Sequence, residues 1–394
     1  MAQQPSISPV IGAETIFEGG PPRRLTALAR LPSPIAPNAG VRTMLTLGLG
    51  WLPLAVLVAV DIAMGRAGVL HSFVEDIGVH ARYAIAAPLL VLAHVVCARR
   101  LGVIARHFQG SGLLGEDDEA RAAQALEATR RRVHSLWAEA AVLIAVYGQV
   151  AALFLTEPAI LRQAQWQVAA DGAGLSAAGW WHAMVSVPLL LALLLGWAWR
   201  IGNWAWFLRS VARLDLRLIA AHPDQSGGLG FLAQSVRAFS IVGMGLGAIV
   251  AGRFAYVHRH DLATPYTDPM LMAGIVVLVL AFAVGPLLFF MRPLMQAWRQ
   301  GALRYGVLAT DMGVQFERNW FRGAPGRPML SEPDFSAATD LYQVVSNVYG
   351  MRFVPVDPRS LVMLVAATLA PFVPAMFLSM PAQVVIDELK ALLF

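Results

Sequence analysis

Residues 270–291 read MLMAGIVVLVLAFAVGPLLFFM, a run without a single charged side chain. A helix needs about 20 apolar residues to cross the hydrocarbon core of a bilayer, and this run has that length. Because no water is present there to hydrogen-bond free backbone groups, a helix is the structure that satisfies them. The run therefore predicts a membrane-spanning helix.

Six further stretches share this length and apolar character. They are residues 44–64, 81–98, 136–155, 181–199, 238–257 and 360–382. The chain as a whole is 57% hydrophobic and only 14% charged, whereas soluble domains are about a quarter charged. We therefore predict an all-α integral membrane protein in which residues 42–394 form one polytopic domain, a bundle of about seven transmembrane helices.

The N-terminal segment, residues 1–41, has a different character. It is rich in Pro, Gly, Ser and Ala, shows no sustained periodicity, and has no basic region leading directly into an apolar core. This composition is typical of disorder and unlike that of a signal peptide. We predict a disordered cytoplasmic tail.

The basic residues indicate an orientation. Most of the 30 Lys and Arg residues lie in the tail and in residues 99–135, 200–237 and 292–359. Since cytoplasmic loops carry the excess of basic residues, these segments are predicted to be cytoplasmic, with the N-terminus inside and the C-terminus outside. Lys390 is the only lysine, which is typical of a GC-rich bacterium, so the predicted location is the bacterial inner membrane. The spread of the charges over separate loops predicts lipid, and not nucleic acid, as the partner.

Four segments outside the spans have amphipathic helical patterns. Residues 113–135 begin with acids and end with arginines, as a helix dipole favours, and are expected to extend the third span. Residues 201–220, 294–321 and 337–350 are expected to form amphipathic helices on the cytoplasmic membrane face. The alternative is that these loops bind a protein partner.

Residues 220–232, AAHPDQSGGLGFL, form a polar, turn-rich connector between two apolar segments. Pro223 disfavours helix at His222, Asp224 or Ser226 can cap the next helix, and Gly227 and Gly228 permit a turn, so a structural break is favoured. As an alternative, these side chains and the glycine amides could bind a cation or phosphate, for which the ligand set is incomplete and the metal unknown.

The connector also carries two resemblances. His222-Pro223-Asp224 is similar to the HPD loop of J-domains, but here the flanks run into membrane segments and not into a soluble helical pair. In the order LDLRLIAAHPDQSGGLGFL, FERNWFRG, SEPDFSAATDLYQVV and PVDPR, the C-terminal half resembles uncharacterised bacterial multi-spanning membrane proteins. That resemblance implies a bacterial membrane location and supplies no catalytic residue.

Ionisable residues within spans are the other candidates, because a charge in hydrocarbon is costly unless it is paired or hydrated. Asp61 and Arg253 fall at the outer level, which permits them to pair, while His94 and Glu139 fall at the inner level. Two such layers suit a gated ion or proton path. The alternative is that each residue lies near a span end and reaches water.

The sequence contains no HExxH, GxSxG or P-loop motif and only one cysteine, Cys97, so we predict no catalytic site, no enzyme activity and no cofactor. Gly243, Gly247 and Ala251 recur every four residues, which favours close helix packing over a gating hinge. Two classes of function remain. The first is small-solute or ion transport, and the second is a non-catalytic sensor or scaffold that binds a partner through its cytoplasmic loops.

Overall fold

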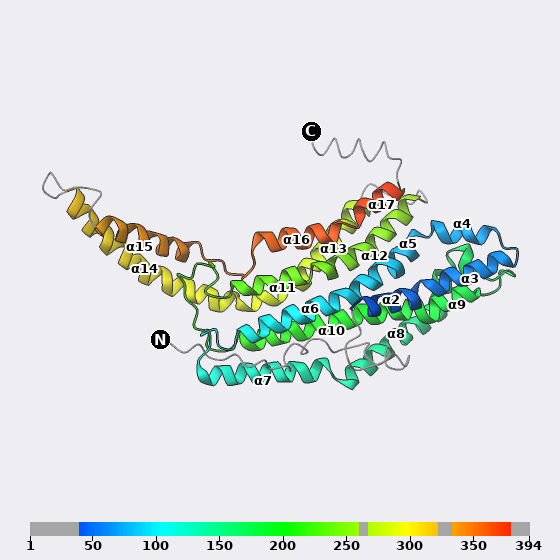
Figure 1. The fold of residues 1–394 in the computed structure, drawn as a ribbon, viewed down its shortest axis with the longest axis horizontal. Helices are drawn as coiled ribbons and strands as arrows, with labels where there is room; N and C mark the ends of the chain where they lie inside the picture. The colour runs from blue at the N-terminus through cyan, green and yellow to red at the C-terminus, as the bar shows by residue number, and fades with distance from the viewer. Residues whose placement is uncertain (1–38, 260–266, 322–332, 380–394) are drawn as a thin grey trace.

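The computed structural model describes residues 39–259, 267–321 and 333–379, and the predicted tail up to residue 38 lies outside these ranges. The described residues are helical apart from loops and one isolated bridge between Val168 and Leu175. The helices run roughly parallel in an elongated bundle (Figure 1). Because α2 (Ala39–Gly50) already begins at Ala39, the last three residues of the predicted tail are helical.

Seven helical segments are long and apolar enough to cross a membrane, which confirms the predicted number of spans. They are Ala39–Ala63, Ile77–His107, Leu136–Thr156, Ala177–Val211, Gly230–Arg259, Pro269–Arg318 and Pro358–Leu378. Several extend well past the predicted boundaries, because amphipathic and arginine-bearing turns continue the same helices beyond the apolar run.

These segments are built from shorter elements, joined with little interruption. The first contains α2 and α3 (Leu52–Ala63), the second α5 (Ile77–His80), η1 (Ala81–Ala86) and α6 (Ala87–His107), the third α8 (Leu136–Thr156), and the fourth α9 (Ala177–Trp181), η4 (His182–Ser186) and α10 (Val187–Val211). The fifth contains η5 (Gly230–Leu232), α11 (Ala233–Ala238) and α12 (Ser240–Arg259), the sixth α13 (Thr267–Val284), η6 (Gly285–Phe290) and α14 (Met291–Trp320), and the seventh α16 (Pro358–Leu369) and α17 (Phe372–Ser379).

Three spans carry a non-α turn at the same short motif, Pro-Leu-Leu. The π-helical turns η1 and η4 end two residues before Pro88 and Pro188, and the 3₁₀ turn η6 contains Pro286. Proline has no N–H and clashes with the carbonyl four residues earlier, so the α pattern is interrupted where it occurs. Such π-turns re-aim the side chains that they carry.

The glycines of α12 are packing positions. A side chain at Gly247 would overlap the Thr368 carbonyl oxygen of α16, and one at Gly245 would press on Leu90 of α6. Close approach of helix backbones is the usual role of small residues in membrane bundles. The packing interpretation of this seam is therefore supported, here by three helices that meet on α12.

Two expectations for the arginine-rich segments are wrong. Residues 113–135 do not extend the third span, since α7 (Glu116–Val133) ends before Ser135, whose extended backbone precedes α8. Residues 201–220 are not a separate helix, because α10 continues to Val211 and the chain then becomes irregular. There the Arg217 N–H bonds the Leu113 carbonyl at 2.8 Å, so a neighbouring loop replaces the helical hydrogen bonds.

The predicted helices at 294–321 and 337–350 are present as α14 and α15 (Pro333–Tyr349). They pack side by side as an antiparallel hairpin that leaves the bundle at one end (Figure 1). The Tyr349 hydroxyl lies over Gly306 and the Tyr342 hydroxyl over Gly313, so two glycines seven residues apart receive two tyrosines seven residues apart. This matched spacing sets the register of the hairpin.

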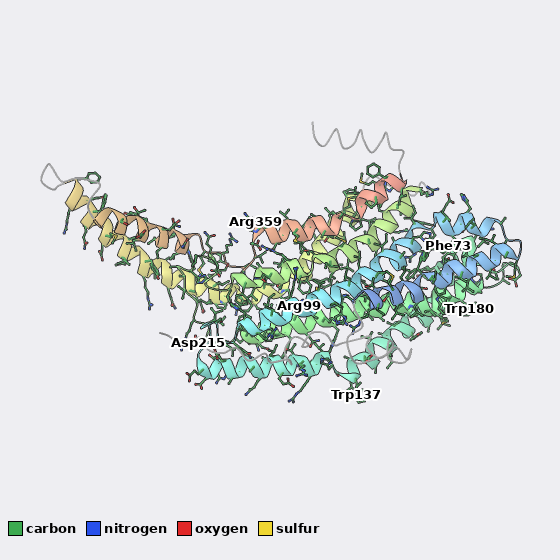
Figure 2. All side chains as sticks on the ribbon, in the orientation of Figure 1. Phe73, Arg99, Trp137, Trp180, Asp215 and Arg359 are labelled. Carbon is green, nitrogen blue, oxygen red and sulfur yellow. The ribbon has the colours of Figure 1, made fainter. Side chains whose placement is uncertain are left out.

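The bundle thus has two distinct ends. Figure 2 shows Arg99, Asp215 and Arg359 toward one end and Phe73 and Trp180 toward the other. We name the first the arginine-rich end, which carries residues 99–135, 200–237, 292–321 and 333–359. We name the second the α4 end, after the short helix α4 (Gly68–Glu75).

Candidate functional site

At the arginine-rich end, the connector closes around the carboxylate of Asp224. Its Oδ1 accepts hydrogen bonds from the N–H groups of Ser226 at 2.8 Å and Gly228 at 3.2 Å, and its Oδ2 accepts from Gly230 N–H at 2.7 Å. Gly230 is the first residue of η5, so Asp224 caps the start of the fifth span, as the sequence favours. Successive amides of this kind form a cradle for an anion, and here the anion is a side chain of the same loop.

His222 completes this arrangement. Its Nδ1 lies 2.7 Å from Asp224 Oδ1 and 3.3 Å from the Asp224 backbone nitrogen; with a proton on Nδ1 the ring donates to the carboxylate, and without one it accepts the Asp224 N–H. Burial alone would raise the pKa of Asp224, but the amides of Ser226, Gly230 and Gly228 and the His222 ring together hold this pKa below its ordinary value. The charged carboxylate is therefore the form that this loop stabilises.

The backbone of the connector requires its glycines. Gly227 and Gly228 have φ of 65° and 96°, which residues with a Cβ rarely adopt, and Gln225 adopts a φ of 54°. Arg352 follows the end of α15 and donates its backbone N–H to the Gln225 carbonyl at 2.7 Å, which holds Gln225 in place. The left-handed positions bend the loop so that its amides converge on Asp224.

The connector also joins separate parts of this end of the molecule. Gly227 packs among Leu218, Leu294 of α14 and Met351, while Gly228 meets Leu113. A Cβ at either glycine would lie 3.1–3.3 Å from these side chains, closer than an ordinary van der Waals contact. The loop is therefore a packed junction between the bundle, the base of the hairpin and the segment that precedes α7.

This geometry favours the structural interpretation of His222, Asp224, Ser226, Gly227 and Gly228. The amides that would bind phosphate already point at Asp224, and the carboxylate oxygens that would bind a cation already accept N–H groups. Within residues 39–259, 267–321 and 333–379, no group of three or more His, Cys, Asp and Glu side chains is placed to hold a metal ion.

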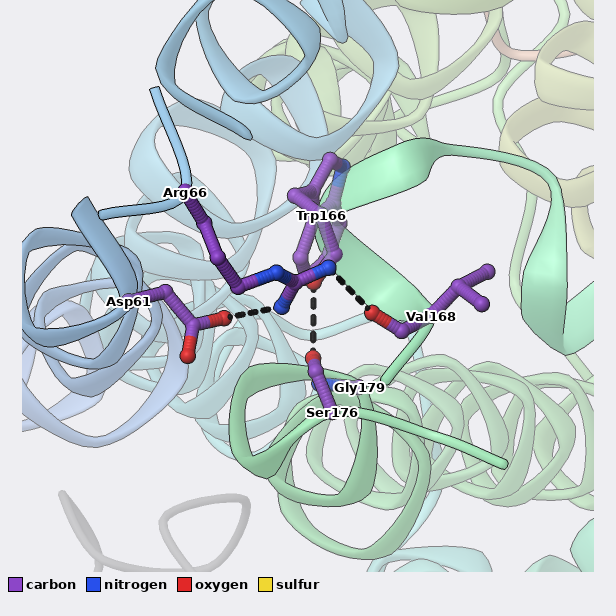
Figure 3. Close-up of polar contacts among 6 residues, drawn as sticks. All are labelled: Asp61, Arg66, Trp166, Val168, Ser176 and Gly179. Carbon is purple, nitrogen blue, oxygen red and sulfur yellow. Dashed lines mark hydrogen bonds and ion pairs between the residues drawn. The ribbon is translucent and has the colours of Figure 1, made fainter. Parts of the chain in front are cut away.

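Asp61 and Arg253 do not form the pair that their shared level permitted. The Asp61 carboxylate binds Arg66 Nη1 at 2.8 Å (Figure 3), while Arg253 is exposed, with its guanidinium 5.4 Å from the centre of the Tyr256 ring. Arg66 follows α3 in the turn at the α4 end, five residues after Asp61, and folds back over the end of its own helix. Local geometry thus supplies the partner that was expected from another span.

Arg66 also clamps a loop that lies far away in the sequence. Its Nη2 donates to the Val168 carbonyl at 2.8 Å. Next to it, Ser176 Oγ donates to the Trp166 carbonyl at 2.7 Å and accepts from Gly179 N–H at 2.9 Å (Figure 3). The loop before the fourth span is therefore tied both to the end of the first span and to the start of α9.

Beneath this clamp lies a buried aromatic and histidine cluster that the sequence did not predict. Its members are Trp51, Phe73, Asp76, His80, Tyr83, Trp166, Gln167 and His182. Trp166 is fully buried and donates Nε1–H to Asp76 Oδ2 at 3.2 Å. The Tyr83 hydroxyl lies 3.1 Å from His182 Nε2, and these two residues sit on the π-turns η1 and η4. The Pro-Leu-Leu motif after each turn was the signal that could have indicated them.

The tautomer of His80 follows from its neighbours. Trp51 Nε1 can only donate, so at 2.9 Å it requires His80 Nδ1 to be an acceptor. The His80 proton is then on Nε2, which lies 2.9 Å from the Phe73 carbonyl and donates to it. A neutral, fully bonded histidine of this kind has a structural role.

On α6 and α10, His94 lies beside Arg200, a residue that sequence reasoning passed over. Arg200 Nη2 is 3.4 Å from His94 Nδ1, and the guanidinium packs over the Trp197 ring. A small cavity of about 10 Å³ beside them is also lined by Cys97 and Phe239. Glu139 is buried on α8, which packs against α10.

Comparison with known proteins adds no name to this architecture. A scan against protein-family models finds no match, and searches of curated proteins and of solved structures find none either. The resemblance to uncharacterised bacterial membrane proteins stays a prediction. Function must therefore be argued from the geometry.

Proposed function

We propose that this chain is a non-catalytic scaffold or sensor of the bacterial inner membrane, which binds a protein partner at its arginine-rich end. The excess of arginine at that end supports a cytoplasmic placement, with the N-terminus inside and the C-terminus outside. Reporter fusions test this topology. A reporter at residue 165 and one at the C-terminus should both report the outer side, and a cytoplasmic signal from either would contradict it.

The α14–α15 hairpin carries the proposal. The segment from Pro269 to Arg318 has 50 residues, whereas about 20 suffice for a bilayer, so α14 continues far past the length that membrane crossing needs. It diverges from the bundle with α15 at its side and exposes large apolar side chains (Figure 1). An extended arm of this kind, braced at its base by the packed connector, is suited to docking.

Photo-cross-linking in native membranes tests the proposal. A photoreactive residue at position 307 on α14 is expected to give a discrete protein adduct of the full chain. The same residue at position 144, an exposed apolar position on the third span, is expected to give lipid adducts and serves as the control. Lipid adducts alone at both positions would contradict a scaffold.

Transport of a small solute or ion is the second candidate, and the small cavity beside His94 and Arg200 favours it. A proton or ion path through this level would use these side chains together with Glu139. Flux measured in reconstituted vesicles should then disappear in Glu139→Gln and His94→Leu and persist in Arg253→Gln. Equal flux in all three variants would exclude this path.

A further inference from the structure

The outer face of α14 carries an apolar stripe that no described part of the chain covers. Its members are Leu303, Val307, Val314 and Phe321, with 75%, 64%, 41% and 78% of their surface exposed. At 100° per residue these positions fall within a narrow sector of the helix. The stripe runs from Leu303 to Phe321, the residue directly after α14, and its ends are about 27 Å apart along the helix axis.

The stripe faces away from α15. The half-buried positions of α14 include Tyr305, Ala309, Met312 and Phe316, which at 100° per residue lie on the other side of the helix from Leu303 and Val314. In Figure 1, α15 lies on the side of α14 toward α16, so the stripe faces away from the spanning helices. A helix that binds a membrane surface turns its apolar face toward the bilayer, so this orientation disfavours lipid as the occupant.

The spacing of the stripe is that of a helix-pairing seam. The a and d positions of a heptad alternate in steps of four and three residues. The positions along the stripe follow these steps: Leu303, Val307, Thr310, Val314, Glu317 and Phe321, of which Thr310 and Glu317 are polar. All of these side chains up to Glu317 are exposed. A second helix could therefore pack along this seam over several turns.

The charges beside the seam indicate which helix fits. Exposed arginines lie on the same side of α14: Arg304 and Arg318 lie beside the stripe with the exposed acids Asp311 and Glu317, and two further arginines, at positions 292 and 299, precede it. Arg304, Asp311 and Arg318 follow one another at intervals of seven on one flank. Consider two copies of the seam paired in antiparallel fashion about its midpoint. Arg304 of one copy would then oppose Arg318 of the other, and the two Asp311 side chains would oppose each other. Such like-charge contacts disfavour a self-pair.

We infer that the outer face of α14 docks an amphipathic helix of another protein whose apolar seam is flanked by acidic residues. This inference rests on the proposed scaffold function and specifies the chemistry of its partner. The apolar stripe supplies the contact area, and the arginines select the acidic flank and the orientation of the bound helix.

A pair of designed peptides tests the inference. Both have about four heptads with Leu at a and d; one has Glu and the other Lys at the flanking e and g positions. Binding to the full chain in nanodiscs of zwitterionic lipid is measured by fluorescence anisotropy. The Glu peptide should bind at least roughly tenfold more tightly than the Lys peptide, and rising salt should reduce this difference.

Matched variants assign the surface. The double substitution Leu303→Ser with Val307→Ser should abolish binding of the Glu peptide. Leu308→Ser, at an exposed apolar position of α14 outside the stripe, should leave it unchanged, and both variants should keep the thermal unfolding temperature of the native chain. Equal binding of the two peptides, or binding that survives the double substitution, would overturn the inference.

The remaining occupants have their own outcomes. The stripe would be assigned to lipid if the chain bound anionic vesicles, the double substitution abolished this binding, and the chain showed no preference for the Glu peptide. Dimerisation in sedimentation that the same substitution abolishes would assign it to a second copy. Either result overturns the inference. A protein adduct at position 307 without a preference for the Glu peptide would refute the partner's chemistry and leave the scaffold intact, whereas absence of any protein adduct would refute both.

Discussion

Two carboxylates, one at each end of the bundle, are stabilised in opposite ways. Asp224 accepts N–H groups that lie two to six residues further along its own loop. Asp61 binds the side chain of Arg66, which in turn donates to Val168, 102 residues away from it in the sequence. The first arrangement is a turn that organises itself, while the second is a clamp that exists only when distant segments have met.

The difference explains what each end can do. At the arginine-rich end, backbone N–H groups stabilise the charged carboxylate of Asp224, so the connector is a rigid base from which α14 can extend. At the α4 end a single guanidinium holds two segments together, and the buried cluster under it depends on that contact. Substitutions should therefore affect the clamp more strongly than the connector.

The largest effect is expected for Arg66→Met. It leaves Asp61, which is largely buried, without its counter-charge and the Val168 carbonyl without a donor, at a cost of about 3 kcal/mol. Thermal unfolding in detergent should show a lower midpoint, and protease should cut the loop before α9 more readily. Arg162→Met, which changes an exposed arginine of the same loop, is the control and should behave as the native chain. Equal midpoints for both variants would mean that the clamp carries no stability.

A smaller loss, about 2 kcal/mol, is expected for Asp224→Asn, because the amide nitrogen cannot accept the N–H groups that the lost oxygen accepted. Unfolding in detergent measures it. Asp215→Asn, at an exposed position in the irregular segment before the connector, should be neutral. If Asp224→Asn is also neutral, the amide cradle does not stabilise the fold, and the ion-site interpretation of the connector regains support.

The third effect is a pH dependence, and it is smaller because it removes only the charge of Asp224. Its pKa is lowered in the folded protein, since the opposing effect of burial is outweighed by the three amides and His222. The stabilisation is therefore complete above the unfolded pKa of about 3.9 and is lost as the pH falls through the folded value. The stability advantage of the native chain over Asp224→Asn should shrink below about pH 4. An advantage that stays constant down to pH 2 would contradict the role of the charge.

The contrast also shows which features the sequence could predict. The seven spans followed from apolar length alone, and the turn at Pro223 with its cap at Asp224 followed from local backbone chemistry. The pair of Asp61 with Arg253 that membrane depth permitted does not form, because matching charges by depth cannot detect a turn that brings Arg66 back over its own helix. The Tyr83 to His182 contact also required knowledge of two π-turns, which shift the faces of both helices relative to a regular α pattern.

The smallest effect is expected for His222→Gln, and it separates the two interpretations of the connector most sharply. His222 contributes one hydrogen bond to Asp224, and its ring is 39% exposed, so solvent screening limits the loss to under about 1 kcal/mol. The amides of Ser226, Gly228 and Gly230 keep the carboxylate charged without it. If His222 is purely structural, the variant should bind the acid-flanked peptide at α14 as the native chain does and show nearly the same unfolding midpoint. An unchanged midpoint with lost binding would instead make this histidine part of the docking surface, and the connector would then differ from the clamp in function as well as in construction.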